Sequence, residues 1–287
     1  MSDPAAPSTP QISIIIPVYR DWDRLATLLT ALEGQRENGT SFEVVVVAND
    51  DTTHPPLHLP MDRFGYCHTP GSYAARNHGA GMARGSILVF TDADCVPQSG
   101  WIAAMAKAAG DRTIVAGDVQ MVTGDPPNFW ERFDQMTGIP QRAYVRRGYA
   151  ATANFAVTRR TFDQVGGFPE DGFSGGDERF CRRAADLGVG VVFAPHAVVI
   201  HPCRDSWPAL AQKVRRTKGG QLRAGPLRRR AYWAVRLFVP PVRQLLVIAR
   251  AKGGVVDKLS AACAAFALWT YGAYEAVRLT LGKRPER

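Results

Sequence analysis

Apolar residues are concentrated in short runs, with stretches of helical spacing between them. The runs cover residues 12–16, 42–47, 86–90, 113–119, 189–193 and 197–201. Most are continuous rather than alternating, which is typical of strands covered on both faces of a sheet. Between the first two runs, Leu25, Leu28, Leu29 and Leu32 recur at helical spacing and predict a helix that ends near Gly34. The pattern predicts an α/β sandwich on a mostly parallel sheet.

Polar residues follow the first three runs. The chain reads Pro17-Val18-Tyr19 after the first, Ala48-Asn49-Asp50 after the second, and Thr91-Asp92-Ala93-Asp94 after the third. Ligands of parallel sheets bind beyond the carboxyl ends of the strands, so we expect these three ends to meet at one crevice. If the chain stays extended there, Asp92 and Asp94 project on the same side.

A pair of aspartates at the end of an apolar strand has three ordinary uses. The carboxylates can ligate Mg²⁺ or Mn²⁺, share a proton as a general acid, or accept hydrogen bonds from a ribose. Their burial as unpaired anions is costly, so a cation or a ligand is expected nearby. These three uses remain open at this stage.

The rest of the chain departs from the α/β alternation. Residues 120–150, rich in proline and glycine, predict a loop region, of the kind that often forms a lid or an acceptor-binding element. From about residue 204 the pattern is helical. Its most apolar stretch, 259–274, is free of charge for 16 residues, short of the roughly 20 needed to cross a bilayer. We expect amphipathic helices that pack on the domain or lie at a membrane surface.

Charge separates the two parts of the chain. Residues 1–200 carry 17 Lys and Arg against 22 Asp and Glu, whereas residues 201–287 carry 18 against 4. A basic segment with interspersed aromatic residues suits anionic lipid or other phosphate-bearing partners. The five cysteines form no CxxC pair and indicate a reducing compartment. Residues 1–10 resemble a short disordered leader rather than a signal peptide, which predicts a cytoplasmic protein.

Two other site types fit the residues less well. The glycines in GAGMARG, residues 79–85, would have to follow a strand and open a helix to bind a dinucleotide. Here they close a predicted helix and precede a strand, so the sequence excludes that site. A zinc site from His196, His201 and Cys203 has suitable residue types without the usual ligand spacing.

Six segments in this order closely resemble the motifs of family 2 inverting glycosyltransferases with the GT-A fold. They are ISIIIPVYR, FEVVVVANDD, GSYAARNHGAGMARGSILVFTDADC, ATANFAVTRRTFDQVGGF, GFSGGDERFCRRAADLG and VVFAPHAVVIH. The resemblance implies a GT-A catalytic domain, a nucleotide-diphospho-sugar transferase fold, over residues 11–203. The remaining residues, 204–287, would form a basic helical C-terminal region.

The resemblance implies a role for each motif. Asp177 matches the general base, Asp94 a ligand of Mn²⁺ or Mg²⁺, and His201 a residue that completes the metal shell in several related enzymes. Glu178 is an alternative to Asp177. On the acceptor side the matching residues are Asn154, Gly167 and Glu178. The nucleotide-sugar donor would be held by Pro17, Tyr19, Asn49, Asp50, Arg76, Asn77 and Asp92, with Arg215 or Arg216 near the diphosphate.

These motifs predict a metal-dependent transfer of a single sugar, with UDP-sugar favoured as the donor. The Gln-x-x-Arg-Trp motif of processive synthases is absent. A lipid-linked or saccharide acceptor, a role in polysaccharide or glycolipid synthesis and a location on the inner face of the cell membrane agree with the basic tail. The alternatives are a sugar-nucleotide nucleotidyltransferase, which would need a triphosphate-binding loop after the first strand, and a non-catalytic protein that binds lipid or nucleic acid. We expect no nucleic-acid partner.

Overall fold

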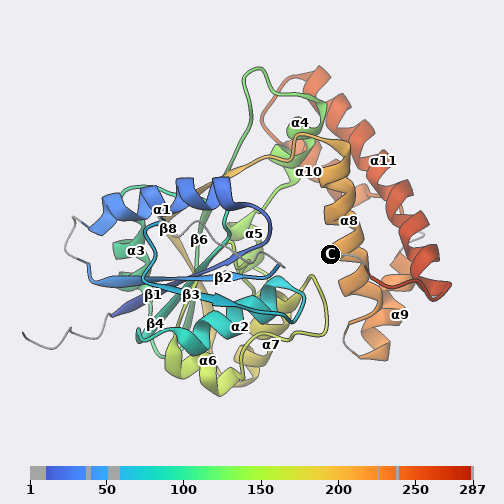
Figure 1. The fold of residues 1–287 in the computed structure, drawn as a ribbon. Coiled ribbons are helices and arrows are strands. Elements are labelled where there is room, and N and C mark those ends of the chain that lie inside the picture. Colours follow the sequence, from blue (N-terminus) through green and yellow to red (C-terminus); the bar gives the residue numbers. More distant parts are fainter. Residues whose placement is uncertain (1–10, 37–39, 51–58, 225, 237–238, 286–287) are drawn as a thin grey trace, which may run out of the picture. The chain divides into compact units, whose positions relative to one another are not determined.

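A computed structural model describes residues 11–36, 40–50, 59–224, 226–236 and 239–285 (Figure 1). The predicted leader, residues 1–10, lies outside these residues. The chain forms two compact units, and each is described by itself. The first comprises Met1–Val119, Gln141–Phe168 and Asp177–Val199, and the second Gln120–Pro140, Pro169–Gly176 and Ile200–Arg287. The boundary predicted at residue 203 stays a prediction.

One mixed sheet organises the first unit. Its order is β3-β2-β1-β4-β7-β6-β8-β5. Strand β1 is parallel to β2 and β4, and β2 is parallel to β3. Strand β7 runs antiparallel to β4 and β6, so the sheet is parallel over only half of its width. The strands are β1 (Ile12–Val18), β2 (Phe42–Ala48), β3 (Arg63–Tyr66), β4 (Ile87–Thr91), β5 (Val96–Pro97), β6 (Thr113–Val122), β7 (Asn154–Thr158) and β8 (Gly190–Pro202).

Helices cover both faces of this sheet, as the continuous apolar runs predicted. In Figure 1, α1 and α3 lie on one face and α2, α6 and α7 on the other. All seven residues of β2 are buried, because each side of the strand packs under helices. The helices of this unit are α1 (Trp22–Arg36), α2 (Ser72–Met82), α3 (Trp101–Ala108), α5 (Gln141–Val145), α6 (Arg159–Val165) and α7 (Gly176–Asp186).

A cluster of phenylalanine rings fixes α7 against the middle of the sheet. Phe90, Phe155, Phe162, Phe168 and Phe180 come from β4, β7, α6, the turn after α6, and α7. Neighbouring rings meet with centroids 4.8–6.0 Å apart, several of them edge to face. Such rings bury large apolar areas and add a geometric preference. The cluster thereby sets the position of the first turn of α7 relative to the carboxyl end of β4.

The two apolar runs at 189–193 and 197–201 form one strand rather than two. Strand β8 continues through the exposed Pro195. Proline lacks the N–H that a ladder requires, so it is tolerated where a strand has no neighbour on that side. The partner on one side of β8 is the two-residue strand β5, which leaves most of that edge unpaired and accommodates the proline.

The second unit is helical and includes part of the region predicted as loop. Helix α4 (Phe129–Thr137) begins at Asn128, whose side chain and that of Glu131 form a capping box. Phe133 of α4 then packs in one apolar core with Leu210 and Ile248. The loop prediction for 120–150 was wrong here, because capping and tertiary packing outweigh a proline-rich composition. The other helices are α8 (Trp207–Leu222), α9 (Leu227–Val235), α10 (Val242–Arg250) and α11 (Val255–Thr280).

Candidate functional site

An arginine and an aspartate meet at the carboxyl end of β4. Arg76 of α2 is 3% exposed, and its guanidinium donates a hydrogen bond to Asp92 Oδ1. The same guanidinium lies 5.5 Å from the centre of the Tyr73 ring. A buried guanidinium needs an anion beside it, and Asp92 supplies one. The predicted donor residues Arg76 and Asp92 therefore form one ion pair.

The chain bends directly after this pair. The backbone N–H of Cys95 donates to the carbonyl of Asp92 at 3.1 Å, so residues 92–95 form a turn rather than the predicted extended segment. Exposure alternates within it, since Ala93 and Cys95 are buried while Asp92 and Asp94 are partly exposed. Both carboxylates thus lie at the surface of the sheet end. The Asp94 carboxylate and the Cys95 thiol lie within 4.8 Å of each other.

Asp177 lies in the first turn of α7 and keeps part of its surface exposed. Its Oδ1 accepts hydrogen bonds from the backbone N–H of Glu178 at 2.9 Å and the Tyr73 hydroxyl at 3.2 Å. Burial raises the pKa of Asp177, while those two bonds and the charge of Arg76 act in the opposite direction. A carboxylate with a raised pKa is suited to accept a proton near neutral pH.

The neighbouring Glu178 has a different environment. Its Oε1 accepts a hydrogen bond from Arg182 at 2.9 Å, one turn further along α7. Such an i,i+4 pair at the helix surface is an ordinary stabilising contact. Asp177 therefore contacts Tyr73 of α2, whereas Glu178 pairs with Arg182 of its own helix.

Two predicted donor-binding asparagines hold loops in place. The Asn49 amide donates to the carbonyls of Cys67 and Thr69 at 2.6 and 2.8 Å, and its oxygen accepts from Gly71 N–H at 2.9 Å. Asn77 binds the backbone N–H and carbonyl of Phe168, both at 2.8 Å. These contacts fix the segment before α2 and the turn after α6. Both side chains are therefore bonded to the backbone of neighbouring loops, and their predicted contact with the donor stays a prediction.

Tyr19 and Asp50 lie at the carboxyl ends of β1 and β2. Asp50 Oδ2 accepts from the backbone N–H of Arg20 at 2.6 Å, and Arg20 adopts φ of 56°. A positive φ is unusual for arginine, and this hydrogen bond stabilises it. The Tyr19 ring is 38% exposed, with the Arg20 guanidinium 5.2 Å from its centre. Pro17, within β1, is partly buried. The strand order brings these ends together with Asp92, as predicted.

Two residues of the acceptor-side prediction have clear structural roles. Asn154 is fully buried; its oxygen accepts from the Trp101 indole at 2.8 Å, and its amide donates to the carbonyls of Asp118 and Ala197. This cross-link fixes its side chain inside the sheet, and its predicted role on the acceptor side stays a prediction. Gly167 has φ of +66°, and an added Cβ would lie 3.0 Å from Asn77 Oδ1, which favours glycine there.

The remaining predicted residues belong to the second unit. His201 is buried near the end of β8, with Nδ1 2.8 Å from the carbonyl of Pro202. A carbonyl can only accept, so Nδ1 carries the proton of this contact. Arg215 and Arg216 lie in α8, and Arg215 donates to the Tyr271 hydroxyl at 3.1 Å.

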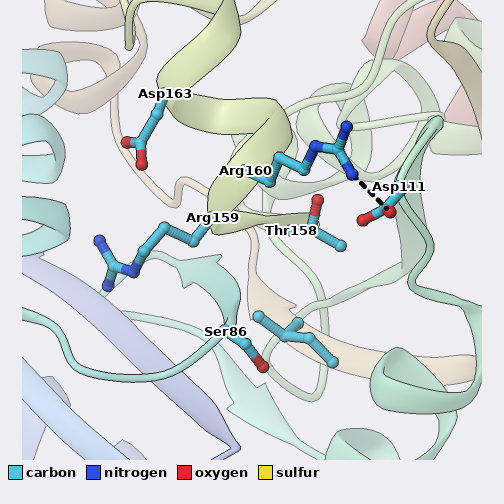
Figure 2. Close-up of a pocket in the computed structure, with 7 residues that line it drawn as sticks. Ser86, Asp111, Thr158, Arg159, Arg160 and Asp163 are labelled. Carbon is cyan, nitrogen blue, oxygen red and sulfur yellow. Dashed lines mark hydrogen bonds and ion pairs between the residues drawn. The ribbon is translucent and has the colours of Figure 1, made fainter.

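A surface pocket lies at the other end of the same strands (Figure 2). Ser86 and Ile87 line it at the start of β4, and Ile87 pairs with Thr158, whereas the site residues follow Thr91. The Arg159 guanidinium beside it is occupied by three backbone carbonyls, and Arg160 pairs with Asp111 at 3.3 Å. Both arginines therefore have structural partners. The pocket is separate from the candidate site because it lies at the opposite end of β4.

The geometry also identifies residues that the sequence reading missed. Tyr73 connects α2 to Asp177, and Arg20 orients Asp50. Tyr73 stands three residues before Arg76, one helical turn away, so its position on the same face of α2 was available from the sequence. Its contact with a residue about a hundred positions later was not.

Comparison with known proteins gives the same family as the motifs. Residues 13–173 match the model of Glycosyl transferase family 2, which is more than half of the chain. The chain is 30% identical over 225 residues to "Glycosyltransferase AglE" of Haloferax volcanii, covering 73% of both chains. It is also 26% identical over 217 residues to the "Pre-mycofactocin glycosyltransferase" of Mycobacterium tuberculosis, covering 70% of this chain and 44% of that protein.

Solved structures agree on the fold. The mannosyltransferase PcManGT of Pyrobaculum calidifontis, solved with GDP-Man and Mn²⁺, superposes with a TM-score of 0.58 at 20% identity, covering 97% of this chain and 89% of that one. The S. aureus TarS 1–349 structure gives 0.53 at 18% identity, covering 95% and 92%. The fold is that of the GT-A glycosyltransferases, with a mixed α/β sheet and C-terminal helices. The chain belongs to glycosyl transferase family 2 and is a glycosyltransferase.

Proposed function

We propose that this enzyme transfers a single sugar from a nucleotide-diphosphate sugar, preferably a UDP-sugar, to an acceptor hydroxyl with inversion at the anomeric carbon. The observation that supports it is the placement of Asp177, whose carboxylate touches Tyr73 next to the Arg76–Asp92 pair. In this proposal the acceptor oxygen attacks the anomeric carbon and gives its proton to Asp177. The bond from that carbon to the diphosphate oxygen breaks, and the diphosphate leaves with the electron pair.

The other polar groups at the strand ends have supporting roles in this proposal. Arg76 and Asp92 lie where a donor nucleotide would meet the carboxyl end of β4, and Asp50 and Tyr19 flank that position on β2 and β1. A guanidinium suits phosphate, and a carboxylate suits ribose hydroxyls. Asn49, Asn77 and Gly167 would support this pocket through the loops that they fix.

We also propose that the donor is bound with Mn²⁺ or Mg²⁺, held by Asp94 and His201. Asp94 offers a carboxylate oxygen, and His201 its Nε2 atom when the imidazole is neutral. Burial and the two nearby aspartates raise the pKa of the Cys95 thiol, which disfavours a thiolate ligand. When bound, such a cation would neutralise the charge of the leaving diphosphate.

A thermal-shift screen tests the donor and the metal together. Because a ligand stabilises the native state by mass action, UDP, GDP and dTDP sugars would be screened with and without Mn²⁺. We expect the largest rise in Tm for a UDP-sugar with Mn²⁺, and loss of the Mn²⁺-dependent part in Asp94→Asn. The matched control is Asp111→Asn at the opposite end of the sheet. A full Mn²⁺-dependent shift in Asp94→Asn would remove this residue from the metal site.

We further propose that the second unit binds the inner face of an anionic membrane, where a lipid-linked acceptor would be available. None of the helices among the described residues is long and apolar enough to span a bilayer. Helix α10 instead exposes Val242, Leu246 and Val247 by 43–52%, and it also carries Arg243 and Arg250. Apolar side chains flanked by arginines are typical of helices at a lipid surface.

Vesicle sedimentation tests this membrane proposal. The double variant Val242→Glu/Leu246→Glu is expected to lose most binding to vesicles of phosphatidylglycerol and phosphatidylcholine. Leu187→Glu, which changes an equally exposed leucine of the first unit, should bind like the unchanged protein. Equal binding by all three proteins would exclude α10 as the contact.

The nucleotidyltransferase alternative has less support. It requires a glycine-rich basic loop after the first strand, whereas the chain there places Tyr19, Arg20 and the start of α1. A non-catalytic role leaves the contacts of Asp177 without a purpose.

A further inference from the structure

The segment Gln141–Ala151, here called the 141–151 loop, lies within the first unit and is closed at its base by one side chain. Gln141 is 1% exposed. Its amide donates to the carbonyls of Ala151 and Asn154 at 3.0 Å, and its oxygen accepts from the Ala151 N–H at 2.9 Å. A loop fixed in this way presents its other residues in one arrangement, which lowers the entropy cost of binding a ligand.

Residues 144–149 of this loop carry two stacked tyrosines and two exposed arginines. The rings of Tyr144 and Tyr149 lie 4.6 Å apart at an angle of 22°. Arg147 donates to the Tyr149 hydroxyl at 3.3 Å, with its guanidinium 5.2 Å from the ring centre. Among the described residues, no carboxylate pairs with Arg146 or Arg147. Two exposed guanidinium groups without a carboxylate partner, in a part of the chain with more acids than bases, favour an anionic ligand.

The loop ends against the first turns of α7. Ala150 is buried in the same apolar cluster as Phe180 and Cys181 of α7, and Tyr149 packs against that cluster. Burial and the neighbouring Tyr144 raise the pKa of Tyr149, and the charges of Asp177 and Glu178 raise it further. The tyrosine stack therefore lies close to the carboxylate that we propose as the base.

We propose that the 141–151 loop is the acceptor-binding element and that it takes a phosphate-bearing acceptor. Arg146 and Arg147 bind the phosphate, and the tyrosine stack contacts the sugar ring or apolar chain that carries the reacting hydroxyl. Guanidinium groups form strong charge-assisted hydrogen bonds to phosphate oxygens. The proposal deepens the function above, because the loop would deliver its ligand to Asp177. A soluble sugar phosphate and a lipid-linked phosphate share this chemistry.

Calorimetric binding distinguishes the two sources. The probes are glucose 1-phosphate and farnesyl phosphate. Each is titrated into protein whose donor site is occupied by a nucleoside diphosphate, chosen as that of the sugar nucleotide with the largest thermal shift. For the tighter probe, Arg146→Gln/Arg147→Gln is expected to weaken binding about tenfold or more. Arg160→Gln removes another exposed arginine of the same unit and should bind normally. Because all three arginines are exposed, thermal unfolding should show that the variants fold.

The outcomes separate this proposal from the catalytic one. Tighter binding of farnesyl phosphate would identify a lipid-linked acceptor, and tighter binding of glucose 1-phosphate a soluble one. No binding of either probe, or equal affinity in the double variant and the unchanged protein, would overturn the proposal. Asp177→Asn should retain probe binding, so a failure of the base assignment leaves this result intact.

Discussion

Each unit of the molecule contains an aspartate surrounded by cationic or polar groups, and the pKa values of the two are shifted in opposite directions. In the first unit, burial raises the pKa of Asp177. In the second, Asp134 is fully buried in α4 and its pKa is lowered to about 2. Burial also acts to raise it, but the charges and hydrogen bonds of Lys213 and Arg204 outweigh that effect.

The contacts explain the difference. Lys213 donates to Asp134 Oδ1 at 2.8 Å, and Arg204 donates to Oδ2 from its backbone and its guanidinium at 2.9 and 3.0 Å. Both oxygens of Asp134 are thus paired with cations. The Oδ1 atom of Asp177 accepts from a neutral phenol and from one backbone N–H, and Arg76 is paired with Asp92. A fully paired carboxylate stabilises a fold, whereas an incompletely neutralised one can take up a proton.

The largest expected effect concerns the first aspartate. Asp177→Asn should reduce transfer by about 10²–10⁴-fold, the range for loss of a general base, while donor-induced thermal shifts persist. Because the raised pKa makes ionisation of Asp177 oppose folding above the unfolded pKa, Tm should not fall. Activity is measured as release of nucleoside diphosphate in the presence of acceptor.

Two further variants test whether Asp177 is the base. Asp186→Asn, at the far end of α7, should transfer sugar normally. Glu178→Gln tests the alternative base: if it abolished transfer while Asp177→Asn remained active, the two roles would be exchanged.

The second aspartate should show the reverse behaviour. Asp134→Asn leaves Arg204 and Lys213 without their anion and should lower the free energy of unfolding by about 3 kcal/mol, as for other broken buried pairs. Chemical denaturation measures this change. Asp205→Asn, at an exposed neighbouring position, is the control. An unchanged denaturation midpoint in Asp134→Asn would show that the pair contributes nothing.

The pH dependence checks the same contact without a mutation. A depressed pKa stabilises the fold above the unfolded value of about 3.8 and loses that contribution as pH falls through about 2. The shift corresponds to about 2 kcal/mol. Acid titration should therefore destabilise the unchanged protein more than Asp134→Asn over this range.

The smallest expected effect concerns Tyr73, which we regard as a positioning residue for Asp177. Tyr73→Phe removes a hydrogen bond to the carboxylate, which favours the ionised form. The pKa of Asp177 should therefore rise further, because a bond of roughly 1 kcal/mol to the ionised form is lost. A base must be ionised, so the acidic limb of the kcat/KM profile should move to higher pH. Tyr274→Phe, an exposed tyrosine of α11, should leave the limb in place; an unmoved limb in Tyr73→Phe would contradict this role.

Much of the first unit could be predicted from the sequence. The apolar runs before Pro17, Asn49 and Asp92 located β1, β2 and β4, because strands covered on both faces need continuous apolar residues. The position of the aspartates at a strand end followed from the same pattern. The order of six motifs then identified the family, which the comparisons confirmed.

Tertiary contacts decided what the sequence could not. The amides of Asn49, Asn77 and Asn154 hold loops and strands together, which the sequence did not indicate because the partners of an asparagine are not visible in it. Their predicted roles at a ligand stay predictions. The helix at Phe129–Thr137 formed against a composition typical of loops because its Phe133 is buried in the second unit.

The sequence by itself determined which side chains gather at the strand ends and the family to which they belong, since local patterning fixes strands and their termini. Only the tertiary structure decided how those side chains are charged and paired. Lys213 and Arg204, 79 and 70 positions away, lower the pKa of Asp134, whereas burial raises that of Asp177. Electrostatic interactions depend on distance in space, and spacing along the chain does not report that distance.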